Sequence, residues 1–142
     1  ARARRRQRAL ERGAITRERG AVVPDPHRDR KRIAARLEPV MREEMERLAR
    51  RHPSVLAHRN IGLFGIVELR KDAQGTPLAP YNGSHPAMAK FNRALLDAGL
   101  YTICRWNNFM TNPPLCITED ELREGFAILD ANLHLIDEVF EG

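Results

Sequence analysis

Apolar residues at helical spacing predict the first structured segment of the chain. Between residues 33 and 51 they recur every three or four positions, which is typical of a helix with one buried face. The members of this stripe are Ile33, Leu37, Val40, Met41, Met45 and Leu48. Proline has no N–H to donate inside a helix, so we expect the regular helix to begin at Pro39 and to end before Pro53.

The last helix carries the clearest local signals. Thr118-Glu-Asp-Glu121 is a capping box, in which the Thr118 and Glu121 side chains each satisfy a free backbone donor. Apolar residues then alternate by four and three at Leu122, Phe126, Leu129, Leu133, Ile136 and Phe140. The pattern predicts one continuous helix whose apolar seam packs onto a sheet.

Residues 55–70 predict a strand. The run from Ile61 to Leu69 is apolar at successive positions, which is typical of a sheet covered on both faces. Gly62 and Gly65 indicate a bulge or the close approach of another backbone. A loop over residues 71–83 follows.

The next helix is predicted from its ends and from a buried apolar stripe of Met88, Phe91, Leu95 and Leu96. We expect Ser84 to cap it, Pro86 to lie in its first turn and Gly99 to follow its end. Two short strands, Tyr101–Arg105 and Phe109–Thr111, are expected on either side of Trp106-Asn-Asn108. The order of elements predicts a small α/β domain with a short β-sheet covered by helices.

Charge divides the chain. Residues 1–36 hold 13 Lys and Arg against 4 Asp and Glu, a net charge of +9, whereas residues 37–142 have a net charge of −4. We therefore expect a basic, flexible tail over 1–36 and one domain over 37–142. An arginine-rich arm could also bind nucleic-acid phosphates, although the segment has no aromatic residue to stack on bases.

No self-sufficient catalytic site is visible, and we assign no catalytic residue, no cofactor-binding residue and no metal ligand. The five histidines are scattered, and Cys104 and Cys116 fit no zinc spacing, so we expect two reduced thiols. Arg105 follows an apolar strand and precedes a polar turn. Its guanidinium could bind a carboxylate or sulfonate through two hydrogen bonds, but the local sequence alone favours an arginine at a strand end in solvent.

Several motifs resemble the class III pyridoxal-phosphate-dependent aminotransferases, a group that includes the ω-amino-acid:pyruvate and taurine:pyruvate enzymes. Residues 59–69, RNIGLFGIVEL, resemble the family's RGxGLxxxIEL strand. Residues 113–118, PPLCIT, resemble its PPLxIT ending, and residues 99–105 occupy the place of its glycine, apolar strand and arginine. His52-Pro53 is also similar. Together these motifs cover about three-quarters of the chain.

The resemblance implies the small C-terminal domain of a fold-type I enzyme. Such enzymes transfer an amino group from an ω-amino acid, an amine or taurine to pyruvate or another 2-oxo acid. A large domain supplies the lysine that binds pyridoxal phosphate, and none of Lys31, Lys71 and Lys90 resembles that lysine's segment. The chain alone is thus expected to be inactive and to bind no cofactor. Arg105 matches the family's substrate-binding arginine.

Two reduced thiols lead us to expect a cytoplasmic protein. The resemblance further implies pairing with a large cofactor-binding domain or a homodimer partner. No membrane association is expected. Two other functions remain open at this stage. One is a non-catalytic binding or structural module that keeps the small-domain fold, and the other is nucleic-acid binding through the arginine-rich tail.

Overall fold

The computed structural model describes residues 26–142, and the flexibility expected for residues 1–25 lies outside the described part. The elements are α2 (Pro26–Arg51), β1 (Val55–Ile61), β2 (Phe64–Leu69), α3 (Pro86–Asp97), β3 (Cys104–Arg105), β4 (Asn108–Thr111), α4 (Glu119–Asn132) and α5 (His134–Asp137). Within this part of the chain, no helix is both long and apolar enough to cross a bilayer.

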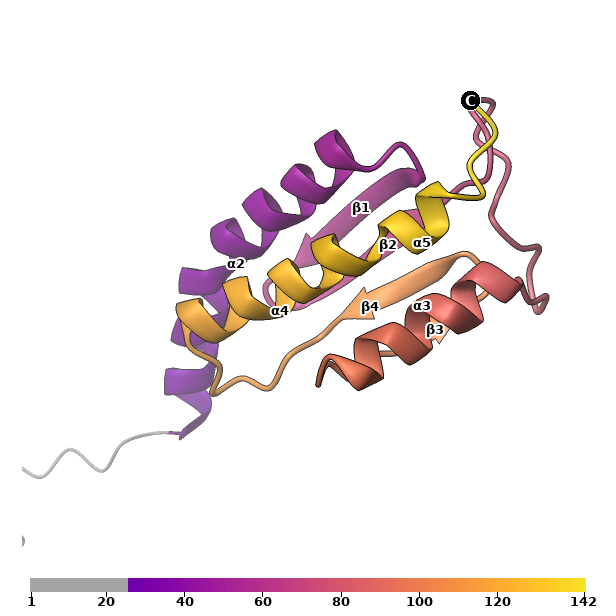
Figure 1. The fold of residues 1–142 in the computed structure, drawn as a ribbon. Coiled ribbons are helices and arrows are strands. Elements are labelled where there is room, and N and C mark those ends of the chain that lie inside the picture. Colours follow the sequence, from indigo (N-terminus) through magenta and orange to yellow (C-terminus); the bar gives the residue numbers. More distant parts are fainter. Residues whose placement is uncertain (1–25) are drawn as a thin grey trace, which may run out of the picture.

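The strands form one antiparallel sheet in the order β1-β2-β4-β3. Helices cover one of its faces: α4 runs across the sheet, α2 flanks it beside β1, and α3 lies on the β3 side (Figure 1). The small α/β fold expected from the order of elements is therefore confirmed, with the helices gathered on a single side of the sheet.

The hydrophobic core lies between the sheet and these helices. Alternate residues of β2 and β4 point into it, as the two-residue period of a strand requires. They include Val67 and Leu69 of β2 and Phe109 of β4, all fully buried. The helices contribute Leu37, Met41, Met45, Leu48, Phe91, Leu95, Leu122, Phe126 and Leu129, so most of the apolar stripes predicted from the sequence are buried. The expectation that Leu96 belongs to the buried stripe of α3 is wrong, because Leu96 is 44% exposed.

Helix α2 is longer than the sequence indicated. It begins at Pro26 and continues through Pro39, so the expectation that the regular helix starts at Pro39 is wrong. Pro39 is exposed, and core residues on both sides, Leu37 and Met41, are fully buried. Their burial holds the helix together across the missing hydrogen bond, which costs about 3 kcal/mol in an isolated helix interior. Residues 26–36, expected in the flexible tail, are helical.

The stretch predicted as one strand is a hairpin. Strands β1 and β2 pair antiparallel around a turn at Gly62-Leu63, where Gly62 adopts a φ of +57° that side chains disfavour. The expectation of a sheet covered on both faces is also wrong for the described residues. Ile61 is 84% exposed and Phe64 is 59% exposed, because no helix lies over that side of the hairpin.

Gly65 shows the close packing that the sequence predicted. A Cβ atom at this position would lie 2.3 Å from Thr111 Oγ1 and 2.5 Å from Met45 Cε. Such distances leave no room for a side chain. The absence of a Cβ therefore lets β2 approach β4 and α2 at the centre of the sheet.

Helix α3 begins one residue later than expected. His85, not Ser84, is its N-cap, and the His85 ring accepts a hydrogen bond from the Ala87 N–H. An extended backbone at His85 places its ring over the first turn, where Ser84 would be too far back. Pro86 is the first helical residue, and Gly99 follows the helix with a φ of +86°, as predicted.

The capping box at the start of α4 is confirmed, with both reciprocal hydrogen bonds between Thr118 and Glu121 present. These bonds lower the pKa of the Glu121 carboxyl, because they favour its charged form. The single long helix expected here is in fact two, α4 and α5, separated at Leu133. A tight hydrogen bond from Ile136 N–H to the Leu133 carbonyl marks the break, while both side chains stay buried.

Candidate functional site

The β3–β4 hairpin presents Arg105, the one site residue predicted from the sequence. Arg105 pairs with Asn108 at the end of β3, which is an edge strand of the sheet. The turn between them has Trp106 at a φ of +50°, a conformation that bulky residues rarely adopt. Asn107 secures the turn, because its carbonyl accepts a 2.6 Å hydrogen bond from the Leu69 N–H.

Aromatic packing supports this unusual turn. The Trp106 ring lies against the Tyr81 ring, with centroids 4.5 Å apart and planes tilted by 50°. Tyr81 comes from the loop before α3. This contact offers one source of the energy that keeps Trp106 in its strained backbone conformation, and backbone strain of this kind concentrates at functional sites.

A cavity of about 380 Å³ opens beside Arg105, between β3 and the first half of α3. Polar side chains in its wall are Ser84, His85, Asn92 and Arg105, with Trp106 next to them. The Nδ1 atom of His85 accepts the helix-capping bond, so the neutral ring carries its proton on Nε2. The wall thus combines a guanidinium with a second N–H donor.

The chemistry of this cavity suits an anion. Arg105 is exposed, and among residues 26–142 it forms no ion pair with a carboxylate. Its planar guanidinium is therefore available for a two-pronged contact with a carboxylate or sulfonate. Sequence reasoning identified Arg105 but missed Tyr81 and His85, which only the fold brings to the same place.

The uncovered face of the sheet adjoins this cavity. Paired residues in an antiparallel sheet point to the same side, so the registers place a common set on the open face: Ala57, Arg59, Ile61, Phe64, Ile66, Glu68, Arg105, Asn108 and Met110. One end of this face is apolar around Ile61 and Phe64. The other end is polar and includes the Arg59–Glu68 ion pair, at 2.6 Å.

A second polar cluster lies at the opposite end of α4 from its capping box. His52 Nδ1 lies 2.6 Å from Asp137 Oδ2, and His52 Nε2 lies 3.0 Å from Asp130 Oδ1. Ser54 Oγ donates to the other Asp137 oxygen, and Arg51 pairs with Asp130. Because Ser54 bonds to Asp137 and not to the ring, the cluster lacks the order of a Ser-His-Asp triad. It ties the start of β1 to the end of the chain.

Other reactive groups offer no alternative centre in the described residues. Burial raises the pKa of the Cys104 thiol to about 11, which keeps it protonated at neutral pH. Both cysteines are free thiols. Residues 26–142 contain no group of three or more His, Cys, Asp or Glu side chains placed to hold a metal ion.

No known family model matches this chain, and no curated protein matches it. Solved structures do. A taurine:2-oxoglutarate aminotransferase from Bifidobacterium kashiwanohense, in complex with PLP and glutamate, is 28% identical with a TM-score of 0.75. The match covers 82% of this chain and 26% of that chain.

Two further solved structures agree. An omega-transferase from Vibrio fluvialis JS17 is 25% identical with a TM-score of 0.67, over 77% of this chain and 25% of that chain. An acetylornithine aminotransferase from Elizabethkingia anophelis has a TM-score of 0.62 over 76% of this chain and 25% of that chain; at 20% identity it shows a shared fold only. This chain thus spans about a quarter of the proteins it matches, and it resembles one part of the pyridoxal-phosphate-dependent aminotransferases in fold and sequence.

Proposed function

We propose that this chain is the C-terminal, substrate-side domain of a class III pyridoxal-phosphate-dependent aminotransferase. The reaction of the whole enzyme would be amino transfer from an ω-amino acid, an amine or taurine to pyruvate or another 2-oxo acid. One observation carries the proposal: most of this chain matches a quarter of a taurine:2-oxoglutarate aminotransferase with a TM-score of 0.75.

The open face of the sheet supports a missing neighbour. The sequence of β2 is apolar at positions that face both sides of the sheet, a pattern typical of strands that are covered twice. In the described residues only one side is covered, and Ile61 and Phe64 stand in solvent. Exposed apolar side chains gathered on one surface commonly mark an interface. We infer that a large cofactor-binding domain covers this face.

Arg105 would supply the substrate contact. Its place between the open face and the anion-suited cavity puts its charge at the edge of the surface that the large domain would cover. A charged hydrogen bond to a carboxylate or sulfonate at such an edge is partly shielded from water, which strengthens it. His85 and Trp106 would then fix the position of the acid group.

We infer that the described residues do not hold pyridoxal phosphate by themselves. Enzymes of this type hold the cofactor through a Schiff-base lysine. None of Lys31, Lys71 and Lys90 lines the cavity beside Arg105. We therefore assign to this chain only the binding and orientation of the substrate, and we assign the chemistry of the cofactor to the large domain.

A first experiment tests the chain alone. The protein is incubated with pyridoxal phosphate, treated with borohydride and analysed by mass spectrometry, and amino transfer to pyruvate is assayed in parallel. We expect no specific adduct and no turnover. A single modified lysine accompanied by turnover would contradict the assignment of the cofactor site to another domain.

A chimera tests the proposed role directly. Residues 26–142 would replace the matching quarter of the Bifidobacterium enzyme, and transfer from taurine to 2-oxoglutarate would be measured. We expect an active chimera. Arg105→Gln in that chimera should raise the KM about 10- to 100-fold for whichever substrate, taurine or 2-oxoglutarate, has its acid group bound by Arg105. The substitution removes a charged hydrogen bond to that acid group.

Arg93→Gln is the matched control, because Arg93 is an exposed arginine paired with Asp97 on α3 and outside the cavity. Its kinetics should equal those of the unmodified chimera. A chimera that folds and binds the cofactor, yet responds equally to both substitutions, would contradict the role of Arg105.

The two alternative functions, a non-catalytic binding module and nucleic-acid binding through the tail, predict different experimental results. A non-catalytic module would keep the open face as a binding surface but would give a folded, inactive chimera. Nucleic-acid binding depends on residues 1–36 and predicts a steeply salt-dependent affinity that is lost when they are deleted. Neither has support from the described residues comparable to the aminotransferase match.

A further inference from the structure

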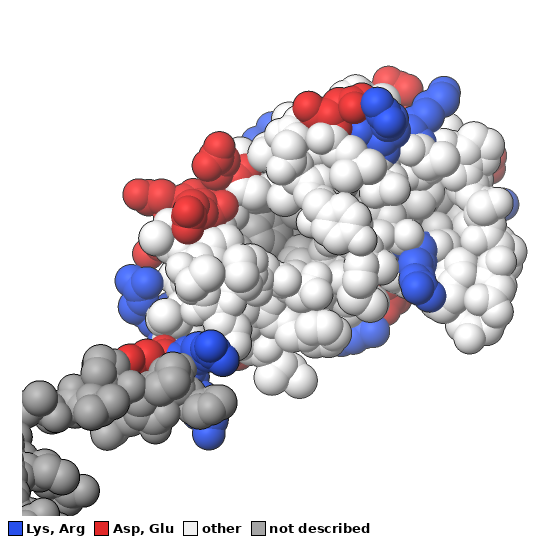
Figure 2. Space-filling view, turned by 90° about the horizontal axis from the view of Figure 1, so that it is seen from below, with Lys and Arg blue, Asp and Glu red and all other residues white. Residues whose placement is uncertain are grey.

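A second cavity lies away from Arg105, on the helix-covered side of the sheet. Its walls come from α4, from β4 with the residues that follow it, and from the segment that joins α3 to β3. Figure 2 shows a hollow bordered mainly by uncharged residues, with acidic residues near one edge. Its volume is about 330 Å³, within the range of small-molecule sites. It shares no lining residue with the cavity beside Arg105.

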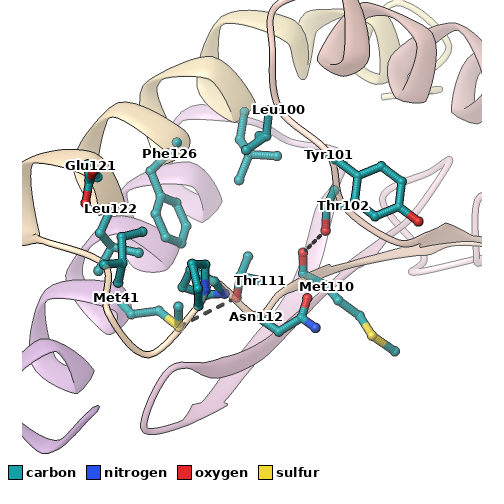
Figure 3. Close-up of a pocket in the computed structure, with 15 residues that line it drawn as sticks. Met41, Leu100, Tyr101, Thr102, Met110, Thr111, Asn112, Glu121, Leu122 and Phe126 are labelled. Atoms are coloured by element: carbon teal, nitrogen blue, oxygen red, sulfur yellow. Dashed lines mark hydrogen bonds between the residues drawn. The ribbon is translucent and has the colours of Figure 1, made fainter. Parts of the chain in front are cut away.

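The lining is predominantly apolar. Phe126 and Leu122 of α4 face Leu100 across the cavity, and Met41 of α2 lies at its side (Figure 3). Phe126 and Leu122 are buried, so these walls are fixed by the packing of the core. A fixed apolar cavity of this size favours an apolar ligand over water, which needs several polar partners.

A helix-interior glycine keeps the cavity open. Gly125 lies in the middle of α4 and lines the cavity, and a Cβ added there would meet only Leu100 Cδ1, at 3.8 Å. Glycine is an unfavourable residue in a helix interior compared with alanine. The fold has room for a side chain at this position, so tight packing does not account for the glycine. A side chain there would occupy part of the cavity, so the glycine is explained if the cavity has to stay open.

The buried hydroxyl of Thr111 in the wall has only a weak hydrogen-bond partner. Thr111 is only 7% exposed, and its hydroxyl has as its partner the Met41 sulfur at 3.6 Å, a weak acceptor. The Thr102 hydroxyl, by contrast, donates to the Met110 carbonyl, and the Glu121 carboxylate is engaged by Thr118. A buried hydroxyl gains most from a ligand that offers it a hydrogen bond.

We propose that this cavity binds a small, uncharged, mostly apolar molecule that carries one hydrogen-bonding group. An engineered apolar cavity of about 150 Å³ accommodates benzene, so a partly open cavity of twice that volume suits a two-ring molecule such as indole. An anionic ligand is disfavoured, because the walls contain no cationic side chain to offset its desolvation. The one charged group in the walls, the Glu121 carboxylate, is already bonded to Thr118 and so offers little to a cation. The proposal stands independently of the proposed enzymatic function.

The test is an NMR titration of the ¹⁵N-labelled 142-residue chain with indole. We expect saturable shifts at the amides of Leu100, Thr111, Gly125 and Phe126, and no saturable shift there with benzoate. Gly125→Leu fills the cavity and improves helix propensity, and it should weaken indole binding at least tenfold. Ala127→Leu is the matched control on the exposed side of α4 and should bind as the unmodified chain does.

Thr111→Val tests the hydroxyl without changing the shape of the wall. It should weaken indole about fivefold and leave the binding of toluene unchanged, because toluene has no hydrogen-bonding group. The proposal is overturned if indole gives no saturable shift, if Gly125→Leu binds it as well as Ala127→Leu, or if benzoate binds equally. Indole binding that declines as the chain dimerises would also overturn it, since a second copy would then fill the cavity.

Discussion

Replacing Gly65 by alanine should destabilise the fold by about 1–3 kcal/mol, the usual cost of overpacking a core. The added Cβ would lie 2.3 Å from Thr111 Oγ1 and 2.5 Å from Met45 Cε, whereas carbon atoms pack at about 3.5–4.0 Å. The methionine methyl ends a flexible side chain and can move aside. The threonine hydroxyl sits on a short side chain in the adjacent strand, so Thr111 is the main obstacle.

A double-mutant cycle isolates that obstacle. Thr111→Ala removes the clashing oxygen, so Gly65→Ala should cost less in this background, with a coupling of about 0.5–3 kcal/mol. Urea unfolding followed by the fluorescence of Trp106, the single tryptophan, measures each free energy. Gly125→Ala is the control with the opposite sign. Its Cβ meets only Leu100 at 3.8 Å, and the change should stabilise the protein by about 0.5–1 kcal/mol.

Two outcomes would refute this reasoning. The first is a Gly65→Ala variant as stable as the unmodified chain, which would mean that β2 and β4 have room to separate. The second is a loss of stability that is the same with and without Thr111, which would place the cost elsewhere in the core.

Two further predictions concern the polar cluster and the cysteines. His52→Gln should lower the free energy of unfolding in urea by about 1.5–3 kcal/mol, because the carboxylates of Asp130 and Asp137 each lose a hydrogen bond from a buried ring. An effect below about 0.5 kcal/mol, typical of surface sites, would contradict this. Iodoacetamide at pH 8 should modify the exposed Cys116 and spare Cys104, as mass spectrometry would show. Because burial raises the Cys104 pKa to about 11, its labelling should increase only as the pH rises toward that value, and labelling of both thiols at equal rates would count against it.

Local signals in the sequence determined much of the fold. The capping box at Thr118 and Glu121, the glycine after α3 and most of the apolar stripes of the helices appear in the structure as predicted. Each of these signals acts within a few residues, so the sequence alone contains the whole interaction. The small α/β domain and the resemblance to aminotransferases followed from the same local patterns.

Interactions between distant segments decided the rest. Pro39 lies inside α2 because the core, not the local sequence, holds that helix together. His52 bonds to carboxylates 78 and 85 residues further along the chain, and Arg105 lines the same cavity as the loop and cap residues before α3. The energy of such contacts depends on which surfaces the chain brings together, and a sequence pattern does not specify that.

The β1–β2 hairpin shows both contributions at once. The sequence determined that these residues are extended and apolar on both faces, because side-chain alternation is a property of the strand itself. The tertiary structure decided where the strand turns, at Gly62, and that the described residues cover only one of the two faces. The apolar positions of a strand indicate which of its faces need to be buried, but only other elements of the fold or a partner can cover those faces.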